Sequence, residues 1–322
     1  MTLKPKAVLA LAAATALSTI ASVSFAPAAF AADAPACKTV RMSDPGWTDI
    51  TSTNALFGVV AEALGYEQKV NTLAVPVTFE GLKIGELDVF LGNWMPVQAR
   101  FVEPLVASGD MVVVKKNLDG IRFTLAVPKY VADGGVKDFK DLAAHADKFG
   151  SKIYSIEAGS AVNQTLTKMV EQGDHGLKGW DIVESSEQGM LGQVKRSEGR
   201  DEWIVFPAWE PHPMNTNHEL VYLTGGDAEF GPNFGSSSVH TVTRKGFAED
   251  CPNLNKLLTQ MTFTVDMENE IMGEILDGGT DPKKAALAYL KAHPDVATPW
   301  VAGVTTFDGG DGEAAVKAAL GG

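Results

Sequence analysis

Short apolar runs alternate along the chain with stretches in which apolar positions recur at helical spacing. The short runs are bounded by Gly, Pro, Asn or Asp, a pattern typical of buried β-strands. We expect strands at 39–42, 70–74, 87–91, 111–114, 123–127, 152–156, 182–184, 203–206, 220–223 and 239–243. We expect helices between them at 53–64, 79–85, 96–107, 140–148, 162–172 and 188–198, and later at 255–258, 265–276, 282–292 and 313–320.

This alternation predicts an α/β fold with mainly parallel sheets that helices cover on both faces. The chain has 322 residues and shows no repeat or low-complexity linker after residue 31. Because one domain typically has about 100–200 residues, we expect two lobes joined by short hinge strands. The hinge candidates are 117–120 and 218–220. The first lobe would comprise 32–118 and 219–322, and the second lobe 119–218.

Residues 1–31 have the pattern of a signal peptide. Lys4 and Lys6 precede an apolar stretch at 8–26, and Ala29-Phe30-Ala31 places small residues where a signal peptidase reads them. Pro27 interrupts the stretch and no second apolar span of about 20 residues follows, which argues against a membrane anchor. We therefore expect export to the periplasm and a mature chain that begins near Ala32.

Charge limits the partners of the mature chain. It carries 25 Lys and Arg against 40 Asp and Glu, a net charge of −15. Such a surface repels nucleic acid and anionic lipid and weakly attracts cations. The sequence also lacks a basic cluster suited to a phosphate backbone, so we exclude nucleic acid as a partner.

The two cysteines, Cys37 and Cys251, both lie in the mature part. In an oxidising compartment we expect them to form a disulfide. Closing so long a loop stabilises a fold by roughly 4–5 kcal/mol in the chain-entropy view. The bond would also place the beginning of the mature chain and its last third in one structural unit, as a discontinuous first lobe requires.

The sequence shows no motif typical of a catalytic or metal site. The six histidines are scattered, and His-Glu-x-x-His, Gly-x-Ser-x-Gly and a phosphate loop do not occur. The segment 308–313 departs from the residue order of a calcium loop, and we expect Asp311 to cap the helix after it. We therefore expect neither a cofactor nor a metal.

Three tryptophans lie in turn-like motifs at the ends of apolar runs: Trp47 after Asp44-Pro45-Gly46, Trp94 before Met95-Pro96, and Trp209 before Glu210-Pro211-His212-Pro213. Rings that meet at strand ends would form a cage for a cation without hydrogen-bond donors, such as a quaternary ammonium ion. Core packing is the alternative for each ring. We assign that structural role to the remaining tryptophans, Trp180, Trp203 and Trp300.

Two polar residues accompany these motifs. Asp49 follows Trp47 by two residues and would supply a charge partner for a cation or an acceptor for a ligand hydroxyl. Capping of the helix that begins near Thr51 is the alternative role. We expect His212, between two prolines, to pack structurally in its turn.

At these segments the sequence resembles the substrate-binding proteins of ABC importers for choline and glycine betaine, above all the choline-binding branch. The resemblance spans nearly the whole mature chain. It rests on Gly46-Trp47-Thr48-Asp49-Ile50, Leu91-Gly92-Asn93-Trp94-Met95-Pro96, Glu184-Ser185-Ser186-Glu187-Gln188-Gly189-Met190-Leu191, Trp209-Glu210-Pro211-His212-Pro213-Met214-Asn215, Met267-Glu268-Asn269-Glu270-Ile271-Met272-Gly273, and 300–303 with 308–312.

By this resemblance, Trp47, Trp94 and Trp209 are cage walls and Asp49 is a polar contact to the ligand. The fourth wall in the family is typically a tyrosine, and Phe123 takes its place here, so the π face remains and a hydroxyl is lost. The choline-binding members have Asn where this chain has Ser160, which is shorter and lacks an amide. Ser160 is therefore expected at the polar end of the ligand.

The resemblance implies a monomeric, two-lobed periplasmic binding protein (type II-like) that closes over its ligand and delivers it to the permease of an ABC importer. We favour choline, since Asp49 would repel the carboxylate of glycine betaine or carnitine, the alternative ligands. Arg122 adjoins Phe123 and points either toward the ligand or away from it. An exported enzyme acting on quaternary amines is the alternative from another class, and a sensing role is compatible with the same fold.

Overall fold

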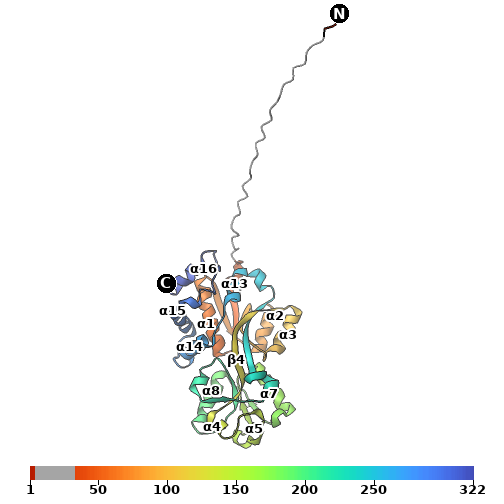
Figure 1. Cartoon of the computed structure of the whole chain (residues 1–322), viewed down its shortest axis with the longest axis vertical. Coiled ribbons are helices and arrows are strands. Elements are labelled where there is room, and N and C mark those ends of the chain that lie inside the picture. Colours follow the sequence, from red (N-terminus) through yellow and green to blue (C-terminus); the bar gives the residue numbers. More distant parts are fainter. Residues whose placement is uncertain (4–32) are drawn as a thin grey trace. The chain divides into compact units, whose positions relative to one another are not determined.

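A long strand, β4 (Met111–Pro128), passes through both halves of the fold and exchanges its partners on the way (Figure 1). Its first part pairs with β9 (Ser236–Arg244). From Phe123 onward it pairs with β7 (Phe206–Trp209) and β8 (Leu220–Tyr222). The exchange of partners marks the border between the two halves.

The computed structural model describes residues 1–3 and 33–322, so the expected signal peptide, apart from its first three residues, lies outside the described chain. The strands of the main sheet follow the order β2-β1-β3-β9-β4-β7, and β8 also pairs with β4. The strands before β4 are β1 (Thr39–Asp44), β2 (Glu67–Thr72) and β3 (Val89–Met95). A separate pair consists of β5 (Lys152–Tyr154) and β6 (Asp181–Val183).

The two-lobed α/β class agrees with the expectation, but the sheets are mixed rather than mainly parallel. Strand β1 runs parallel to β2 and β3, and β5 runs parallel to β6. Strand β9 is antiparallel to β3 and β4, and β7 and β8 are antiparallel to β4. The reason is topological: β4 carries the chain out of the first half and β9 returns it, so the two strands run in opposite directions.

Helices cover both ends of β4 (Figure 1). One end is covered by α1 (Thr48–Ala63), α2 (Val75–Lys83), α3 (Ala99–Ser108), α12 (Phe247–Asp250), α13 (Pro252–Gln260), α14 (Val265–Leu276), α15 (Pro282–Ala292) and α16 (Gly312–Ala319). The other end carries α4 (Lys129–Asp133), α5 (Phe139–Ala144), α6 (Ala146–Phe149), α7 (Ala161–Gln172), α8 (Glu187–Glu198), α9 (Met214–Asn217), α10 (Asp227–Phe230) and α11 (Pro232–Gly235). Short 3₁₀ turns lie at Pro35–Lys38, Asp174–Gly176 and Pro294–Val296. As expected, the Asp311 carboxylate caps its helix and accepts from the backbone N–H of Ala314 at 3.0 Å.

The first hinge candidate, 117–120, lies where the pairing of β4 with β9 is irregular, because the register shifts between Lys116 and Leu118 and again before Ile121. The second candidate precedes β8, which pairs with the far part of β4. Phe230 also packs against Phe139 of the second half, with ring centroids 5.9 Å apart. Residues after 219, in β8 and at Phe230, thus contact the second half before β9 begins.

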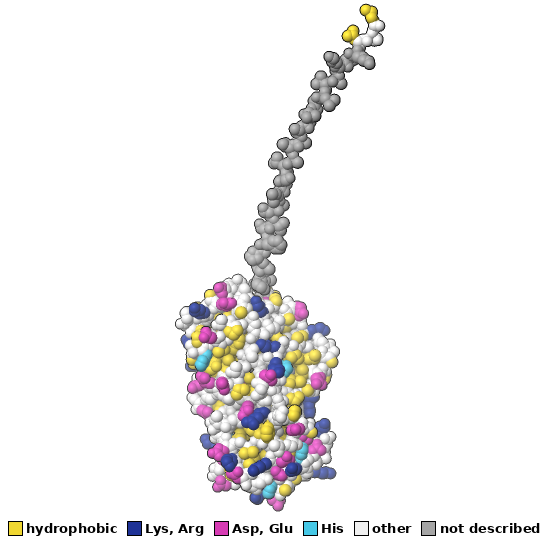
Figure 2. Space-filling view, in the orientation of Figure 1, with side chains coloured by type: hydrophobic (Ala, Val, Ile, Leu, Met, Phe, Trp, Pro, Cys, Tyr) yellow, Lys and Arg dark blue, Asp and Glu magenta, His cyan; other side chains and the backbone are white. Residues whose placement is uncertain are grey.

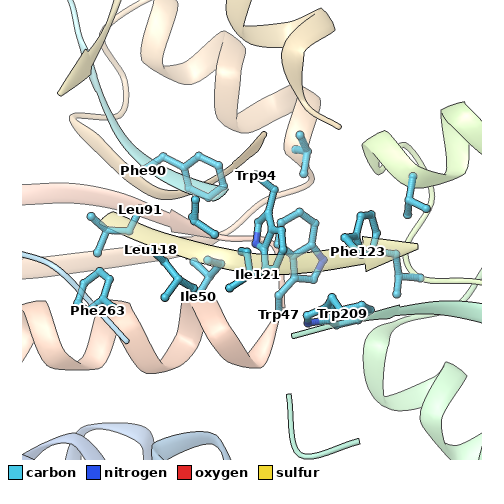
Figure 3. Packing of buried hydrophobic residues seen from close by; sticks show 14 of the residues in the cluster. Trp47, Ile50, Phe90, Leu91, Trp94, Leu118, Ile121, Phe123, Trp209 and Phe263 are labelled. Carbon is cyan, nitrogen blue, oxygen red and sulfur yellow. The ribbon is translucent and has the colours of Figure 1, made fainter. Parts of the chain in front are cut away.

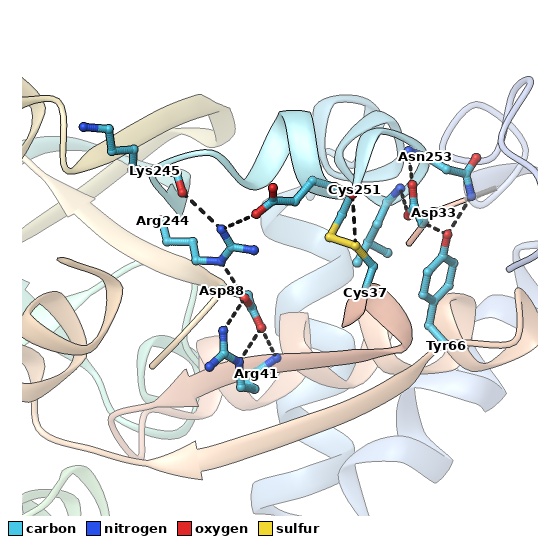
Figure 4. The surroundings of a disulfide bond; sticks show 11 residues. Asp33, Cys37, Arg41, Tyr66, Asp88, Arg244, Lys245, Cys251 and Asn253 are labelled. Atoms are coloured by element: carbon cyan, nitrogen blue, oxygen red, sulfur yellow. Dashed lines mark hydrogen bonds and ion pairs between the residues drawn. A yellow bond between two sulfur atoms is a disulfide. The ribbon is translucent and has the colours of Figure 1, made fainter. Parts of the chain in front are cut away.

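The predicted disulfide is present: Cys37 and Cys251 are bonded, with their Cα atoms 5.7 Å apart (Figure 4). Beside it, the Asp33 carboxylate accepts hydrogen bonds from the backbone N–H groups of Asn253 at 2.8 Å and Leu254 at 3.0 Å. These groups begin α13, whose own N-cap residue, Cys251, provides no side-chain cap. A bond and a cap thus attach the segment 33–37 to α13.

Acidic and basic side chains are interspersed on the face of the protein shown in Figure 2. Within residues 1–3 and 33–322, we find no helix that is both long and apolar enough to cross a membrane.

Candidate functional site

A small cavity lies where the two halves meet. Its lining is aromatic and aliphatic except for one carboxylate. The lining residues are Trp47, Asp49, Trp94, Phe123, Ile156 and Trp209. All three tryptophans that the turn motifs singled out therefore share one site, together with Phe123 and Asp49.

The strand and helix ends bring these rings together. Trp47 is the N-cap residue of α1, Trp94 lies near the end of β3, and Trp209 is the last residue of β7. Phe123 is directly opposite Trp209 in the antiparallel pair of β4 and β7. The ring centroid of Phe123 lies 5.8 Å from that of Trp209 and 5.9 Å from that of Trp94, and Figure 3 shows the rings grouped along β4. Such contacts fix the ring planes of the site.

Asp49 is the polar group of the cavity and is only 1% exposed. It lies in the first turn of α1, and its Oδ2 accepts a hydrogen bond from Nε1 of Trp94 at 2.9 Å. Its Oδ1 is buried without a hydrogen-bond partner. Burial, and after it the charge of Glu187, raise the pKa of Asp49 to about 8. The carboxylate is thus placed against a low-dielectric site in which a cation would be its natural counter-charge.

Further carboxylates surround the cavity, and the sequence motifs did not assign them to the site. Oε2 of Glu157 accepts from Nε1 of Trp47 at 3.0 Å, and burial raises the pKa of Glu157 to about 7. Glu187, at the start of α8, is buried against the start of α1. Glu268 of α14 is also buried, and burial followed by the charge of Asp49 raises its pKa. The electrostatics of the site favour a positively charged occupant.

Ser160 does not line the cavity. It is the N-cap of α7, and its Oγ accepts from the backbone N–H of Asn163 at 3.3 Å. Ile156, four residues earlier, lies in the lining instead. The expected contact of Ser160 with a ligand therefore stays a prediction, for which the observed capping bond offers a structural role.

Arg122 is directed away from the cavity. Its guanidinium donates to Oε1 of Glu210 at 2.6 Å and lies 4.1 Å from the ring centroid of Tyr222. His212 packs its ring against Trp209 at 5.2 Å and accepts from the backbone N–H of Met214 at 2.9 Å, in keeping with a structural role in the turn. No basic side chain thus belongs to the lining.

Within the described ranges, 1–3 and 33–322, no group of three or more His, Cys, Asp or Glu side chains is arranged to hold a metal ion. Trp180 and Trp300 pack elsewhere, against Phe149 and Phe263 respectively.

Solved structures with high similarity share this fold. One is an ABC-transporter choline-binding protein in complex with choline, which is 54% identical, gives a TM-score of 0.88, and matches 89% of this chain and 99% of that one. An ABC-transporter choline-binding protein in an unliganded, semi-closed conformation is also 54% identical over the same shares and gives a TM-score of 0.83.

Among curated proteins, uncharacterized protein ORF1 of Chromohalobacter salexigens is 46% identical over 149 residues, which are 46% of this chain and 94% of that protein. Residues 38–292 match the family described as the substrate-binding domain of the ABC-type glycine betaine transport system. Because this match covers most of the chain, the protein belongs to that family of transport substrate-binding domains.

Proposed function

We propose that this protein binds a small quaternary ammonium ion, choline in preference to glycine betaine or carnitine, and delivers it to the permease of an ABC importer. The composition of the cavity is the main support for this proposal: it is lined by three tryptophans, one phenylalanine, one isoleucine and a single carboxylate, without a basic side chain. The similarity to a choline-binding protein solved with choline supports the same ligand.

The aromatic rings suit the head group of such a ligand. A trimethylammonium group has no N–H to donate, so carbonyl or hydroxyl acceptors cannot bind it through directed hydrogen bonds. The faces of Trp47, Trp94, Phe123 and Trp209 offer negative potential instead. Each desolvated contact contributes roughly 0.5–2 kcal/mol. Four such contacts sum to roughly 2–8 kcal/mol before the cost of closure, so burial of the methyl groups must supply the rest of the about −8 kcal/mol that micromolar binding requires.

The polar groups favour a neutral tail over a carboxylate tail. Oδ1 of Asp49 is an unpaired acceptor and suits a hydroxyl donor. A carboxylate tail would be repelled by Asp49 and the nearby Glu157 once the bound cation has displaced their protons. Arg122, the cation closest in sequence to a cage residue, is already paired with Glu210. These contacts support choline as the ligand.

The lobes would close over this ligand. The proposed lobes are those expected from the sequence, 32–118 with 219–322 and 119–218, with the segment up to β9 packed on the second one. The bond between Trp47 and Glu157 joins the two lobes, and so does that between Nδ2 of Asn217 and Oδ1 of Asp277, at 3.1 Å. The higher TM-score against the choline complex than against the semi-closed form supports a closed arrangement here.

We further propose that the protein works as a binding component rather than an enzyme, and in the periplasm after removal of residues 1–31. The family consists of transport substrate-binding domains, which supports the first point. N-terminal sequencing of the exported protein tests the second, with Ala32 as the expected first residue. Release of a product from choline by purified protein would contradict the first.

Calorimetric titration tests the ligand. Ligand-free mature protein is titrated with choline, glycine betaine, carnitine and acetylcholine, and we expect choline to bind most tightly. Trp94→Ala and Trp209→Ala should each weaken choline binding about tenfold or more. Trp203→Ala is the matched control, because Trp203 lies outside the cavity and packs against Phe149. Failure of all four ligands, or equal binding by the cage variants and the control, would refute the cage.

A further inference from the structure

Glu187 is a buried carboxylate whose oxygens face the other lobe. It is the first residue of α8, and its side chain is fully buried. Its Oε2 accepts from the backbone N–H of Thr48 at 3.0 Å, and its Oε1 accepts from the Thr48 hydroxyl. Both bonds span 139 residues of sequence. A buried carboxylate is costly unless it is paired, so these bonds hold Glu187 in place only while α8 and α1 are in contact.

The start of α1 depends on this contact. Its N-cap residue is Trp47, which makes no side-chain cap. Glu187 supplies the acceptor that the helix lacks, at the end where the helix dipole favours negative charge. The same short segment carries the cage wall Trp47 and the carboxylate Asp49. The orientation of two cage residues is thus linked to a side chain of the opposite lobe.

Glu187 also approaches His212, whose ring packs against the cage residue Trp209. Nε2 of His212 lies 3.3 Å from Oε1 of Glu187, close enough for electrostatic contact although not aligned as a hydrogen bond. Because Nδ1 of His212 accepts from Met214, the neutral ring carries its hydrogen on Nε2, the nitrogen that faces Glu187. The His212 ring packs against Trp209. Glu187 therefore contacts the segment that carries Trp47 in the first lobe and the segment that carries Trp209 in the second lobe.

Like charge opposes this arrangement in the absence of a cation. The negative charge of Glu187 acts on Asp49, which lines the cavity, and on Glu157, which is bonded to Trp47. Closing the lobes brings these carboxylates together in a region of low dielectric. A cation in the cage offsets that repulsion. The bonds between Glu187 and Thr48 then stabilise the closed form.

We propose that Glu187 is a positioning residue that latches the lobes: by capping α1 across the cleft, it holds the completed cage around a bound cation and slows its release. The inference deepens the proposed function and rests on it. Glu187 and Thr48 do not line the cavity, so the latch acts on how long the closed form lasts rather than on the encounter with the ligand.

Dissociation kinetics test the latch. We expect Glu187→Gln to release choline at least about tenfold faster than the parent, with an association rate within about twofold, since glutamine has one acceptor oxygen and no charge for the donors it faces. Stopped-flow tryptophan fluorescence on mature protein measures both rates. The matched control is Glu229→Gln, which alters another Glu–His pair: Oε1 of Glu229 lies 3.0 Å from Nε2 of His175, and neither residue lines the cavity or belongs to a hinge candidate. The control should leave both rates close to those of the parent.

A double-mutant cycle with Thr48→Val separates the latch from a role confined to the second lobe. We expect non-additive effects of Thr48→Val and Glu187→Gln on the dissociation rate, since Thr48→Val removes one of the two donors to Glu187 and Glu187→Gln leaves one acceptor oxygen for both donors. If Glu187→Gln does not fold, Thr48→Val alone should still accelerate release. Unchanged release from both variants, or strict additivity, would overturn the latch. A parent that binds none of the four compounds overturns the proposed function and the latch with it, whereas choline binding with unaltered variant kinetics overturns the latch alone.

Discussion

The indole N–H of Trp94 donates to Oδ2 of Asp49 at 2.9 Å, which links a wall of the proposed cage on β3 to the first turn of α1. Both side chains are buried. The bond leaves Oδ1 of Asp49 without a partner in the same aromatic site. The two oxygens of Asp49 thus differ: Oδ2 orients the ring of Trp94, and Oδ1 is free to accept a hydrogen bond from a ligand.

This division predicts the effect of Asp49→Asn. The amide oxygen can still accept from Trp94, so the wall stays in place while the charge is lost. We expect choline affinity to fall about 10- to 100-fold, the equivalent of roughly 1.5–3 kcal/mol for a bond to a charged group. The affinity for glycine betaine should fall less, because a repulsion with its carboxylate is removed as well. Parallel calorimetric titrations measure the ratio of the two affinities, and an unchanged ratio would contradict the role of Asp49.

The same carboxyl group predicts a dependence on pH. Burial, and then the charge of Glu187, raise the pKa of Asp49 to about 8 from an ordinary value of 3.8. Because the folded-state pKa lies above the unfolded value, protonated Asp49 contributes stability at low pH, and that contribution is lost as pH rises toward about 8. A bound cation favours the ionised form and displaces the proton.

We therefore expect choline to bind more tightly as pH rises from about 6 to about 8, by at most about tenfold per pH unit for each proton released. Glu157, with a pKa raised by burial to about 7, should add to the effect. Titrations in two buffers with different ionisation enthalpies report the released protons directly. The Asp49→Asn variant should release fewer protons than the parent when it binds choline. Equal affinity across this range without proton release would show that Asp49 is already ionised before the cation binds.

The sequence singled out the aromatic residues that line the cavity but not the carboxylates around it. Trp47, Trp94 and Trp209 stand in local turn motifs, so their positions at strand ends follow from neighbouring Gly and Pro. Glu157 and Glu187 reach the site through bonds that span 110 and 139 residues, and no local pattern marks such contacts. An acidic residue directly after a predicted strand, as at Glu157, was the available signal.

The fold shows the same limit. The apolar runs locate β3 and the two ends of β4, which the sequence divides into separate strands at 111–114 and 123–127, and their alternation with helices indicates an α/β protein. The antiparallel pairing of β4 and β9 depends on how the chain crosses between the two halves. The residues of one strand do not indicate that path. Ser160 illustrates a third case, since a residue placed by resemblance at the ligand caps a helix in the structure.

Ser160→Ala distinguishes the two roles of that residue. As the N-cap of α7, Ser160 accepts from the backbone N–H of Asn163, and losing a cap costs about 1 kcal/mol. We expect the free energy of unfolding to fall by about that amount, while choline affinity stays within about twofold of the parent. Urea unfolding and calorimetry of the same preparation measure the two quantities. A loss of affinity without a loss of stability would instead place Ser160 at the ligand.

The disulfide predicts a change in stability without a change in recognition. Cys37 and Cys251 are separated by 214 residues, and their loop includes every residue of the cavity. Opening so long a loop raises the entropy of the unfolded chain, and we expect Cys37→Ser with Cys251→Ser to lower the free energy of unfolding by roughly 4–5 kcal/mol. Neither cysteine lines the cavity, so choline affinity at a temperature well below unfolding should stay within about twofold of the parent.

Urea unfolding of the parent with and without reductant provides the control, since reduction should reproduce most of the effect of the double variant. Asp33 still caps α13 in both, so the segment 33–37 keeps its second attachment when the bond is absent. If the variant unfolds at the same urea concentration as the oxidised parent, the cap alone accounts for that attachment. In that case the bond contributes no measurable stability.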